Sequence, residues 1–439
     1  MIYSLLFFLP TQLGRHFWFD WSSKLGQRVD YLSPTVYFTD LIILLTLIVY
    51  SIKSIKTKNL KLKAENKILN LKSFLKVYKL LVFSFLLLVV SYWLLFIKEN
   101  PYLLAYNLAK LVEFVLLGVV IAKTFTRIDL PKIISVLNLS LLVQVGLAFY
   151  QVVVEKSLGL WIIGERNFGI YTPGIAKFTS FSGHQLLRGY GTFPHPNVLA
   201  GFCLLLLVAN TFLFLGRRRN ENITIYVFGF ILSLLGIWLS LSVLAIVLSQ
   251  VFLLFLLLKY FKSLKKIFLI FSPILIFGVF VFRFPNYQLP FTNYLASESV
   301  SRRVTLSGIS WNMFKKSPIF GVGLGNFIPS MPEAPIGKTY FWQPVHNVIA
   351  LILAETGLVG GVVIGWLFWK LVARFMIYDL RIKSRIFLNL KSYILILASW
   401  WLVILATGLF DHYWLTLQQG RLMLTVVASL SFLRAVSEK

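Results

Sequence analysis

The side chains best suited to chemistry lie in a polar stretch, residues 285–345, and at the start of the apolar segment that follows it. His346 stands at that junction, where an imidazole of ordinary pKa can accept a proton near neutral pH. Arg302 and Arg303 lie earlier in the stretch, and a guanidinium group can bind a diphosphate through paired hydrogen bonds. These residues predict proton abstraction beside a phosphate-containing substrate.

The same residue types also have simpler roles. His346 could anchor the chain at lipid headgroups, and Asn347 could be a helix cap. Arg302 and Arg303 could bind headgroups from an amphipathic helix. Glu355 lies about half a helical revolution from His346, so we predict a buried, hydrogen-bonded carboxyl instead of a catalytic partner.

A second polar loop, residues 155–195, carries Arg166, Arg188 and His195. Prolines on both sides of His195 predict a fixed, non-helical entry into the next apolar segment. Arg166 and Arg188, like Arg302 and Arg303, could bind either a diphosphate or lipid headgroups, and headgroup binding is the simpler interpretation. His195 is a supporting candidate.

The stretch 285–345 also shows local structure. An apolar-aromatic stripe at helical spacing predicts an amphipathic helix that faces membrane or protein, with Arg303 beside the stripe; its members are Val300, Val304, Ser307, Trp311 and Phe314. After Pro318, three alternating glycines at 321, 323 and 325 predict a turn whose backbone N–H groups could face an anion.

Composition defines the surroundings of these residues. Apolar residues make up 58% of the 439, and the mean hydropathy is +0.79, which excludes a soluble domain. We predict one all-α, polytopic membrane domain over 1–439, with 11 or 12 spans, since residues 1–9 alone are too short to cross. The expected spans are 34–52, 73–97, 101–123, 132–154, 196–215, 223–240, 241–258, 264–284, 346–369, 391–410 and 415–435.

The positive charges predict the orientation. Most of the 43 Lys and Arg residues fall in short loops that alternate with the polar loops 155–195 and 285–345, which places the basic loops in the cytoplasm and the polar loops outside. The net charge of +27 then indicates contact with anionic membrane lipid and no nucleic-acid partner. The basic loop 53–79 is expected on the inner membrane surface.

Cofactor signatures are absent from the sequence. Cys203 is the only cysteine and lies in an apolar span, which excludes a disulfide or a thiolate metal site. Neither a His-x-x-x-His spacing nor a P-loop or dinucleotide fingerprint is present. We therefore predict no metal and no cofactor.

The order of these motifs resembles the O-antigen ligase and O-antigen polymerase family. The matching runs are SRR at 301–303, PIFGVGLGNF at 318–327, HNV at 346–348, ETGLVG at 355–360 and FPHPNVLAG at 193–201. The resemblance implies a glycosyltransferase in the cytoplasmic membrane with its active site facing outward. It would move a glycan from an undecaprenyl-diphosphate carrier to a hydroxyl of a glycolipid or growing glycan, without a metal.

Within that resemblance, His346 corresponds to the base that activates the acceptor hydroxyl, and Arg303 to the arginine that binds the diphosphate. One departure concerns a second arginine, which the family often has after a serine at the outer end of a middle span. The comparable run 240–243 has Val243 at that position. Our hypothesis is that Arg166 or Arg188 takes its place, which requires the two loops to converge.

Other functions remain open at this point. Ligation to a lipid core, polymerisation of lipid-linked repeat units and transfer to protein use the same donor chemistry and differ only in the acceptor. A flippase or transporter for lipid-linked glycans should carry charged groups in mid-span, and Lys110, Glu113 and Arg421 are the main candidates here. The concentration of polar residues in the outer loops favours an enzyme over a transporter or a scaffold.

Overall fold

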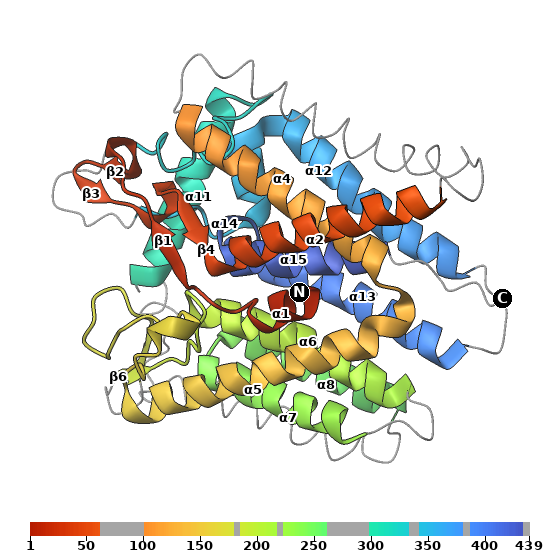
Figure 1. Cartoon of the computed structure of the whole chain (residues 1–439). Coiled ribbons are helices and arrows are strands. Elements are labelled where there is room, and N and C mark those ends of the chain that lie inside the picture. The colour runs from red at the N-terminus through yellow and green to blue at the C-terminus, as the bar shows by residue number, and fades with distance from the viewer. Residues whose placement is uncertain are drawn as a thin grey trace.

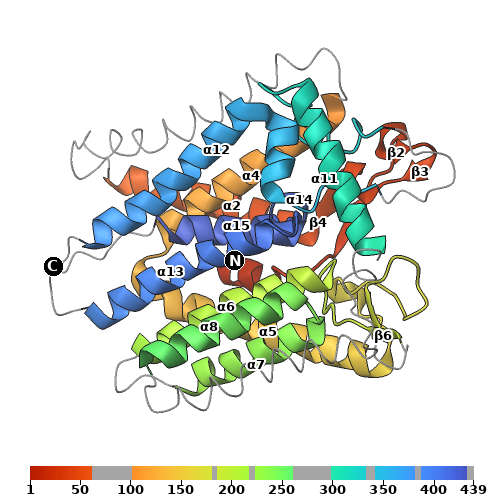
Figure 2. The ribbon, with the colours of Figure 1, turned by 180° about the vertical axis from the view of Figure 1, so that it is seen from behind.

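The computed structural model describes residues 1–61, 101–179, 185–216, 223–260, 298–332, 342–380 and 387–432. They form a helical bundle with short strands and loops gathered at one end (Figures 1 and 2). The described residues include 4 helices long and apolar enough to cross a membrane: Tyr102–Thr124, Arg127–Val154, Pro196–Gly216 and Val348–Lys370. Shorter apolar helices lie beside them, and the chain is an all-α, polytopic membrane protein as its composition predicts.

The helices are α1 (Ile2–Phe7), α2 (Phe38–Lys61), α4 (Pro101–Thr124), α5 (Leu130–Val154), α6 (Pro196–Gly216), α7 (Thr224–Ser240), α8 (Val243–Tyr260), α11 (Glu298–Lys316), α12 (Val348–Leu380), α13 (Phe387–Gly408), α14 (Tyr413–Thr416) and α15 (Gln418–Leu430). Three antiparallel strand pairs complete the fold: β1 (Gly14–His16) with β4 (Thr35–Tyr37), β2 (Ser23–Lys24) with β3 (Gln27–Arg28), and β5 (Lys177–Thr179) with β6 (Gln185–Leu187).

The split between two spans near residue 241 is confirmed. Helix α7 ends at Ser240, Leu241 takes a left-handed conformation with φ of 47°, and α8 begins at Val243. The expected spans 73–97 and 264–284 lie outside the described residues, as does most of the basic loop 53–79.

Three helix boundaries differ from the prediction. Residues 35–37 form strand β4 and not the start of a span, because they pair with β1. The expected span 415–435 is divided into α14 and α15 at Leu417, which has an extended backbone. Helix α12 continues to Leu380, past the expected boundary at residue 369. Helix α1 has only 6 residues, which agrees with the prediction that residues 1–9 alone are too short to cross.

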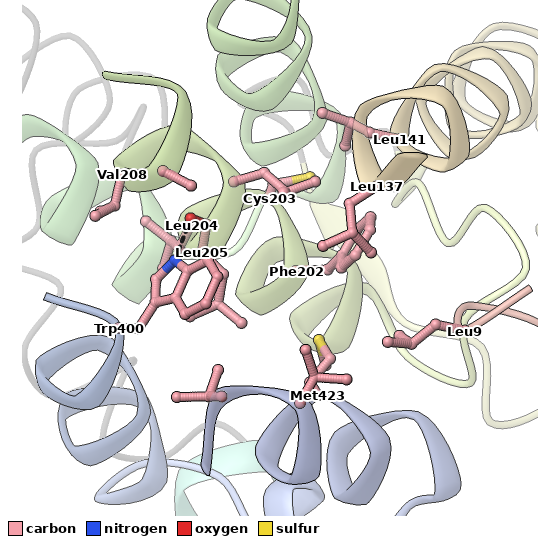
Figure 3. Close-up of a cluster of buried hydrophobic side chains, with 14 of the residues drawn as sticks. Leu9, Leu137, Leu141, Phe202, Cys203, Leu204, Leu205, Val208, Trp400 and Met423 are labelled. Atoms are coloured by element: carbon pink, nitrogen blue, oxygen red, sulfur yellow. Dashed lines mark hydrogen bonds between the residues drawn. The ribbon is translucent and has the colours of Figure 1, made fainter. Parts of the chain in front are cut away.

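Helix α6 is the centre of the bundle. It packs against α5, α7, α8 and α13, and most of its side chains are buried. Figure 3 shows the buried side chains around it, where the indole Nε1 of Trp400 on α13 donates a hydrogen bond of 2.6 Å to the Leu205 carbonyl. Because α6 starts at Pro196, this packing fixes the position of His195 and Asn197 at its entrance.

The N-terminal cap, residues 14–37, and the helix α11 share a second, smaller core. Its buried side chains include Leu32, Leu306 and Phe327. Lys24 fastens the cap to the polar loop, since its Nζ donates to the carbonyls of Ile328, Pro329 and Met331 at 2.6, 2.8 and 2.7 Å. We call the end of the bundle that holds the cap, β5–β6 and α11 the loop end (Figure 1).

Helix α12 is interrupted at Gly357, whose φ of 60° and ψ of −162° are not helical. A break in an apolar helix leaves backbone groups without partners, which is costly in a membrane. Residues 318–323 supply the partners: Val322 and Gly323 donate to the carbonyls of Ala354 and Glu355 at 2.9 and 2.8 Å, and the N–H groups of Leu358 and Val359 donate to Pro318 and Ile319 at 2.8 and 3.1 Å.

Two glycines make this backbone crossing possible. A Cβ at Gly321 would stand 2.3 Å from the Glu355 carbonyl carbon, and a Cβ at Gly357 would stand 2.4 Å from that of Ile319. Both positions also have a positive φ, of 71° and 60°. The glycine turn therefore lies against the α12 break, and its backbone groups form hydrogen bonds with the groups that the break leaves without helical partners.

We expect Gly357→Ala to lower the thermal stability of the purified protein. The conformation costs a residue with a Cβ about 1–3 kcal/mol, and the overlap with Ile319 adds to that cost. Gly365→Ala is the matched control, because Gly365 lies in the same helix with no atom within 4 Å of its added Cβ. Equal melting temperatures for the two variants in detergent would contradict this account of the crossing.

The charged groups inside the bundle pair with one another. Lys110 on α4 forms ion pairs with Asp40 on α2 and, at 3.2 Å, with Glu113 one turn away. Gln418 on α15 donates to the second oxygen of Asp40 at 2.5 Å. On α15, Arg421 Nε donates to the Leu415 carbonyl at 2.5 Å. These groups tie α2, α4 and α15 together.

Candidate functional site

The candidate site lies at the loop end, where His346, Asp411 and His412 come together. Coordinating atoms of the three side chains lie within 4.8 Å of one another. His346 precedes α12, and the other two residues lie between α13 and α14. We call these three residues the histidine cluster.

Asn347 fixes the position of His346. Its side-chain oxygen accepts a hydrogen bond of 2.9 Å from the Ala350 N–H, which caps α12. Its Nδ2 donates to the Leu409 carbonyl at 3.1 Å, near the end of α13. The cap interpretation of Asn347 therefore fits its contacts, and the same side chain holds the two halves of the cluster next to each other.

His412 is held by two rings and one hydroxyl. Its ring centroid lies 5.0 Å from that of His346 and 5.6 Å from that of Tyr31 in the N-terminal cap, both in edge-to-face geometry. Its Nδ1 is 2.7 Å from Thr416 Oγ1. The cap therefore forms one wall of the site.

Asp411 connects the cluster to the loop 155–195. Its Oδ2 accepts a hydrogen bond of 2.9 Å from Asn197 Nδ2, and the Asn197 oxygen accepts one of 2.8 Å from Arg188 Nη2. Arg188 Nε also donates to the Ser240 carbonyl at 2.8 Å. The loop 155–195 and the α7–α8 break therefore meet at Arg188, while its role as a substitute for the missing arginine at Val243 stays a hypothesis.

Burial sets the charge state of the cluster. It lowers the pKa of His346 to about 3, with His412 acting in the same direction, while Asp411 opposes the shift. Burial and then Arg188 lower the pKa of His195 to about 3. Burial alone would raise the pKa of Asp411, but the neighbouring histidines and Asn197 hold that pKa below its ordinary value. Burial also lowers the pKa of His412, so the resting cluster contains neutral imidazoles beside a carboxylate.

Arg302 and Arg303 reach the same site from α11. Arg303 Nη1 donates to the Phe410 carbonyl at 3.1 Å, next to Asp411, and both guanidinium groups lower the pKa of His346. On the same helix, Leu306 and Met313 pack into the smaller core, whereas Val304 and Trp311 of the predicted stripe are 67% and 57% exposed. These two side chains of the stripe therefore face away from the smaller core, and the described residues do not cover them.

Arg166 and His195 lie at the edge of the site. Arg166 Nη2 donates to the Pro194 carbonyl at 3.2 Å, and its guanidinium carbon lies 5.7 Å from the centre of the Tyr190 ring. His195 Nδ1 accepts a hydrogen bond of 3.1 Å from the Asn197 N–H, so it stabilises the entrance to α6. Arg166 therefore lies against Pro194 and Tyr190, while His195 is close enough to Arg188 and Asp411 for both to influence its pKa.

Glu355 does not join the cluster. It is 8% exposed, and its Oε1 accepts a hydrogen bond of 3.3 Å from the Phe327 N–H at the end of the glycine turn. This contact agrees with the prediction of a buried, hydrogen-bonded carboxyl. Its position beside the α12 break indicates a role in holding the polar loop.

Sequence reasoning did not single out Asp411, His412, Asn197 or Tyr31. Asp411 and His412 form a two-residue turn between apolar segments, and no motif marks them. A signal was nevertheless present, because an adjacent Asp and His at the predicted outer end of two spans lie on the same side as His346.

The fold and the site together define a class: a polytopic membrane protein with a partly buried histidine–carboxylate cluster and several arginines at one end of its helices. Residues 228–365 match the model of the Wzy_C family, described as O-antigen ligase, and this match supports the resemblance of the chain to the O-antigen ligase and polymerase family. The matched residues include Arg302, Arg303 and His346. No curated protein matches the chain. Glycan transfer of the O-antigen ligase or polymerase type is the general activity that this family supports.

Proposed function

We propose that this protein transfers a glycan from an undecaprenyl-diphosphate carrier to a sugar hydroxyl, at the outer face of the cytoplasmic membrane. The observation that carries the proposal is the convergence of His346, Asp411 and Arg303 at the loop end. They come from segments far apart in the sequence. A neutral base, a carboxylate and guanidinium groups are the parts that such a transfer requires.

His346 is the proposed base. Its neutral imidazole accepts the proton of the acceptor hydroxyl while the hydroxyl oxygen attacks the anomeric carbon of the donor sugar. The imidazolium that forms gains stability from the nearby Asp411 carboxylate, which favours the charged ring. Attack from the side opposite the leaving diphosphate inverts the anomeric centre.

Arg303 is the proposed ligand of the diphosphate, with Arg302 and Arg188 beside it and Arg166 at the edge. The bond from the anomeric carbon to the phosphate oxygen breaks, and the electron pair leaves with undecaprenyl diphosphate. This leaving group is already anionic, so guanidinium groups can stabilise it without a metal ion. The lipid tail then lies along the apolar helices, with the diphosphate at their polar end.

The main alternative is a flippase for lipid-linked glycans. That function calls for charged groups along a path through the membrane. Among the described residues, Lys110 instead pairs with Asp40 and Glu113 between α2 and α4, and Arg421 donates a hydrogen bond to the Leu415 carbonyl. This pairing favours the enzyme over the transporter.

The test is glycan transfer in proteoliposomes that contain an undecaprenyl-diphosphate oligosaccharide and one acceptor at a time. The acceptor panel should include a glycolipid core and the lipid-linked repeat unit itself. Product with the glycolipid indicates a ligase, and longer lipid-linked chains indicate a polymerase. Movement of the carrier across the bilayer with no transferred product on any acceptor would overturn the enzyme in favour of a flippase.

Arg188→Ala is expected to weaken binding of the donor about tenfold or more, because hydrogen bonds to charged groups contribute about 1.5–3 kcal/mol. Arg188→Lys should retain the charge but not the contacts to both Ser240 and Asn197. Its affinity for the donor should therefore lie between that of Arg188→Ala and that of the wild type. Arg15→Ala is the control, since Arg15 is exposed on the N-terminal cap. Unchanged affinity of Arg188→Ala for the lipid carrier would remove Arg188 from the donor site.

A further inference from the structure

We propose that the histidine cluster is also a binding site for a divalent transition-metal ion of the Zn²⁺ type, formed by His346, Asp411 and His412, and that a bound ion blocks glycan transfer. Two imidazoles and one carboxylate, with coordinating atoms within 4.8 Å of one another, are a ligand set that suits such ions. The three residues lie on two segments, 346 and 411–412, so no short sequence spacing marks the site.

The hydrogen bonds of His412 leave one ring nitrogen available for a metal. Thr416 has a single hydroxyl proton, and its Oγ1 donates to the His412 carbonyl at 3.0 Å. The contact of 2.7 Å between the same oxygen and His412 Nδ1 is then a hydrogen bond from Nδ1–H to the hydroxyl. This assignment places the lone pair of His412 on Nε2. Metal-binding histidines commonly have their other nitrogen held in this way.

Asp411 is oriented by its neighbours. One oxygen accepts from Asn197 Nδ2 at 2.9 Å and the other from the His412 N–H at 2.8 Å. Each carboxylate oxygen has a second lone pair, so both hydrogen bonds can persist while Asp411 coordinates an ion. Asn197 is itself held by Arg188, which makes the carboxylate a fixed ligand.

His346 supplies the observation that points to a ligand. Its Nδ1 is buried and, among the described residues, has no hydrogen-bond partner. A buried polar atom without a partner is costly, and a metal ion beside the cluster would provide one. Arg302 and Arg303 repel a cation from the same place. We therefore expect binding to be weaker than at a structural zinc site.

The consequence for activity rests on the proposed function. A metal ion would occupy a nitrogen lone pair of His346, and a coordinated imidazole cannot act freely as a base. The ion would also neutralise the Asp411 carboxylate that stabilises the imidazolium. Both effects lower transfer, and a chelator that removes the ion should restore it.

Binding is tested first, with the full-length protein in nanodiscs, purified through a tag that contains no histidine. Titration with Co²⁺, followed by its visible absorption, and calorimetry with Zn²⁺ should give one bound ion per chain. His412→Gln and Asp411→Asn should lower the affinity at least tenfold. His16→Gln should bind as the wild type does, because His16 lies in the N-terminal cap, outside the cluster. Equal affinity in all four proteins, or no binding, would overturn the site.

Inhibition is tested separately in the transfer assay. Zn²⁺ should reduce the initial rate over the same concentration range in which it binds, and EDTA should restore the rate. If Zn²⁺ binds at the cluster and the rate of transfer is unchanged or higher, the proposed inhibition is wrong. The metal-binding site itself would still stand. Because the binding measurement does not depend on turnover, its result stands even if the protein transfers no glycan.

Discussion

His346→Ala is expected to lower the rate of glycan transfer by about 10²–10⁴-fold, the usual contribution of a general base. The loss should appear in kcat and much less in the affinity for the donor, because the arginines proposed to bind the diphosphate remain. The measurement is the initial rate in proteoliposomes at saturating donor and acceptor. His346→Gln should be as inactive as His346→Ala, since an amide can form hydrogen bonds but cannot accept a proton at neutral pH.

The rates of the variants are compared at equal expression and equal melting temperature, so that a loss of folded protein is not counted as a loss of activity. His16→Ala removes another partly buried histidine of the loop end without touching the histidine cluster, and it should retain transfer. A rate for His346→Ala within about threefold of the wild type would exclude His346 as the base, given the size of a general-base contribution. The base would then have to be sought at His412 or elsewhere.

Asp411→Asn is expected to have the second-largest effect, a loss of roughly 10–100-fold in kcat. The substitution retains the shape of the side chain but removes the negative charge that stabilises a protonated His346, and interactions with a charged group contribute about 1.5–3 kcal/mol. Asp20→Asn is the control, because Asp20 is an exposed acid of the N-terminal cap. Wild-type kcat in Asp411→Asn would show that the carboxylate has no part in the proton transfer.

The two substitutions should not be additive. If Asp411 acts through His346, then the double variant His346→Ala, Asp411→Asn should be about as slow as His346→Ala alone. A further loss equal to that of Asp411→Asn in the wild-type background would indicate an independent role, such as holding Asn197 and Arg188. The cycle therefore separates the proton-transfer role of Asp411 from its structural contacts.

The helices were predictable because their signals are local. An apolar run of about 20 residues must form its backbone hydrogen bonds within itself in a membrane, so length and hydropathy alone predict a helix. The division at residues 240–242 followed from length in the same way. The strands of the N-terminal cap have 2 or 3 residues each and depend on their pairing, which leaves no periodic pattern in the sequence.

Part of the site was also predictable. His346, Arg302 and Arg303 were identified by residue type and by their place at the entrance to a span, and the structure brings them to one end of the bundle. Asn347 and Glu355 have contacts that agree with the simpler interpretations of a helix cap and a buried carboxyl. Their chemical roles remain proposals.

The amino-acid sequence by itself determined that the chain is a helical membrane protein, that two spans separate near residue 241, and which loop leads to the candidate base. Each of these depends on neighbours along the chain. Only the tertiary structure decided that Asp411 and His412 stand beside His346, that Arg188 reaches Ser240 and Asn197, and that Tyr31 covers His412. Apart from Arg188–Asn197, these contacts join residues more than 50 positions apart. They form because the packing around α6 and the crossing at Gly357 bring the ends of separate helices together.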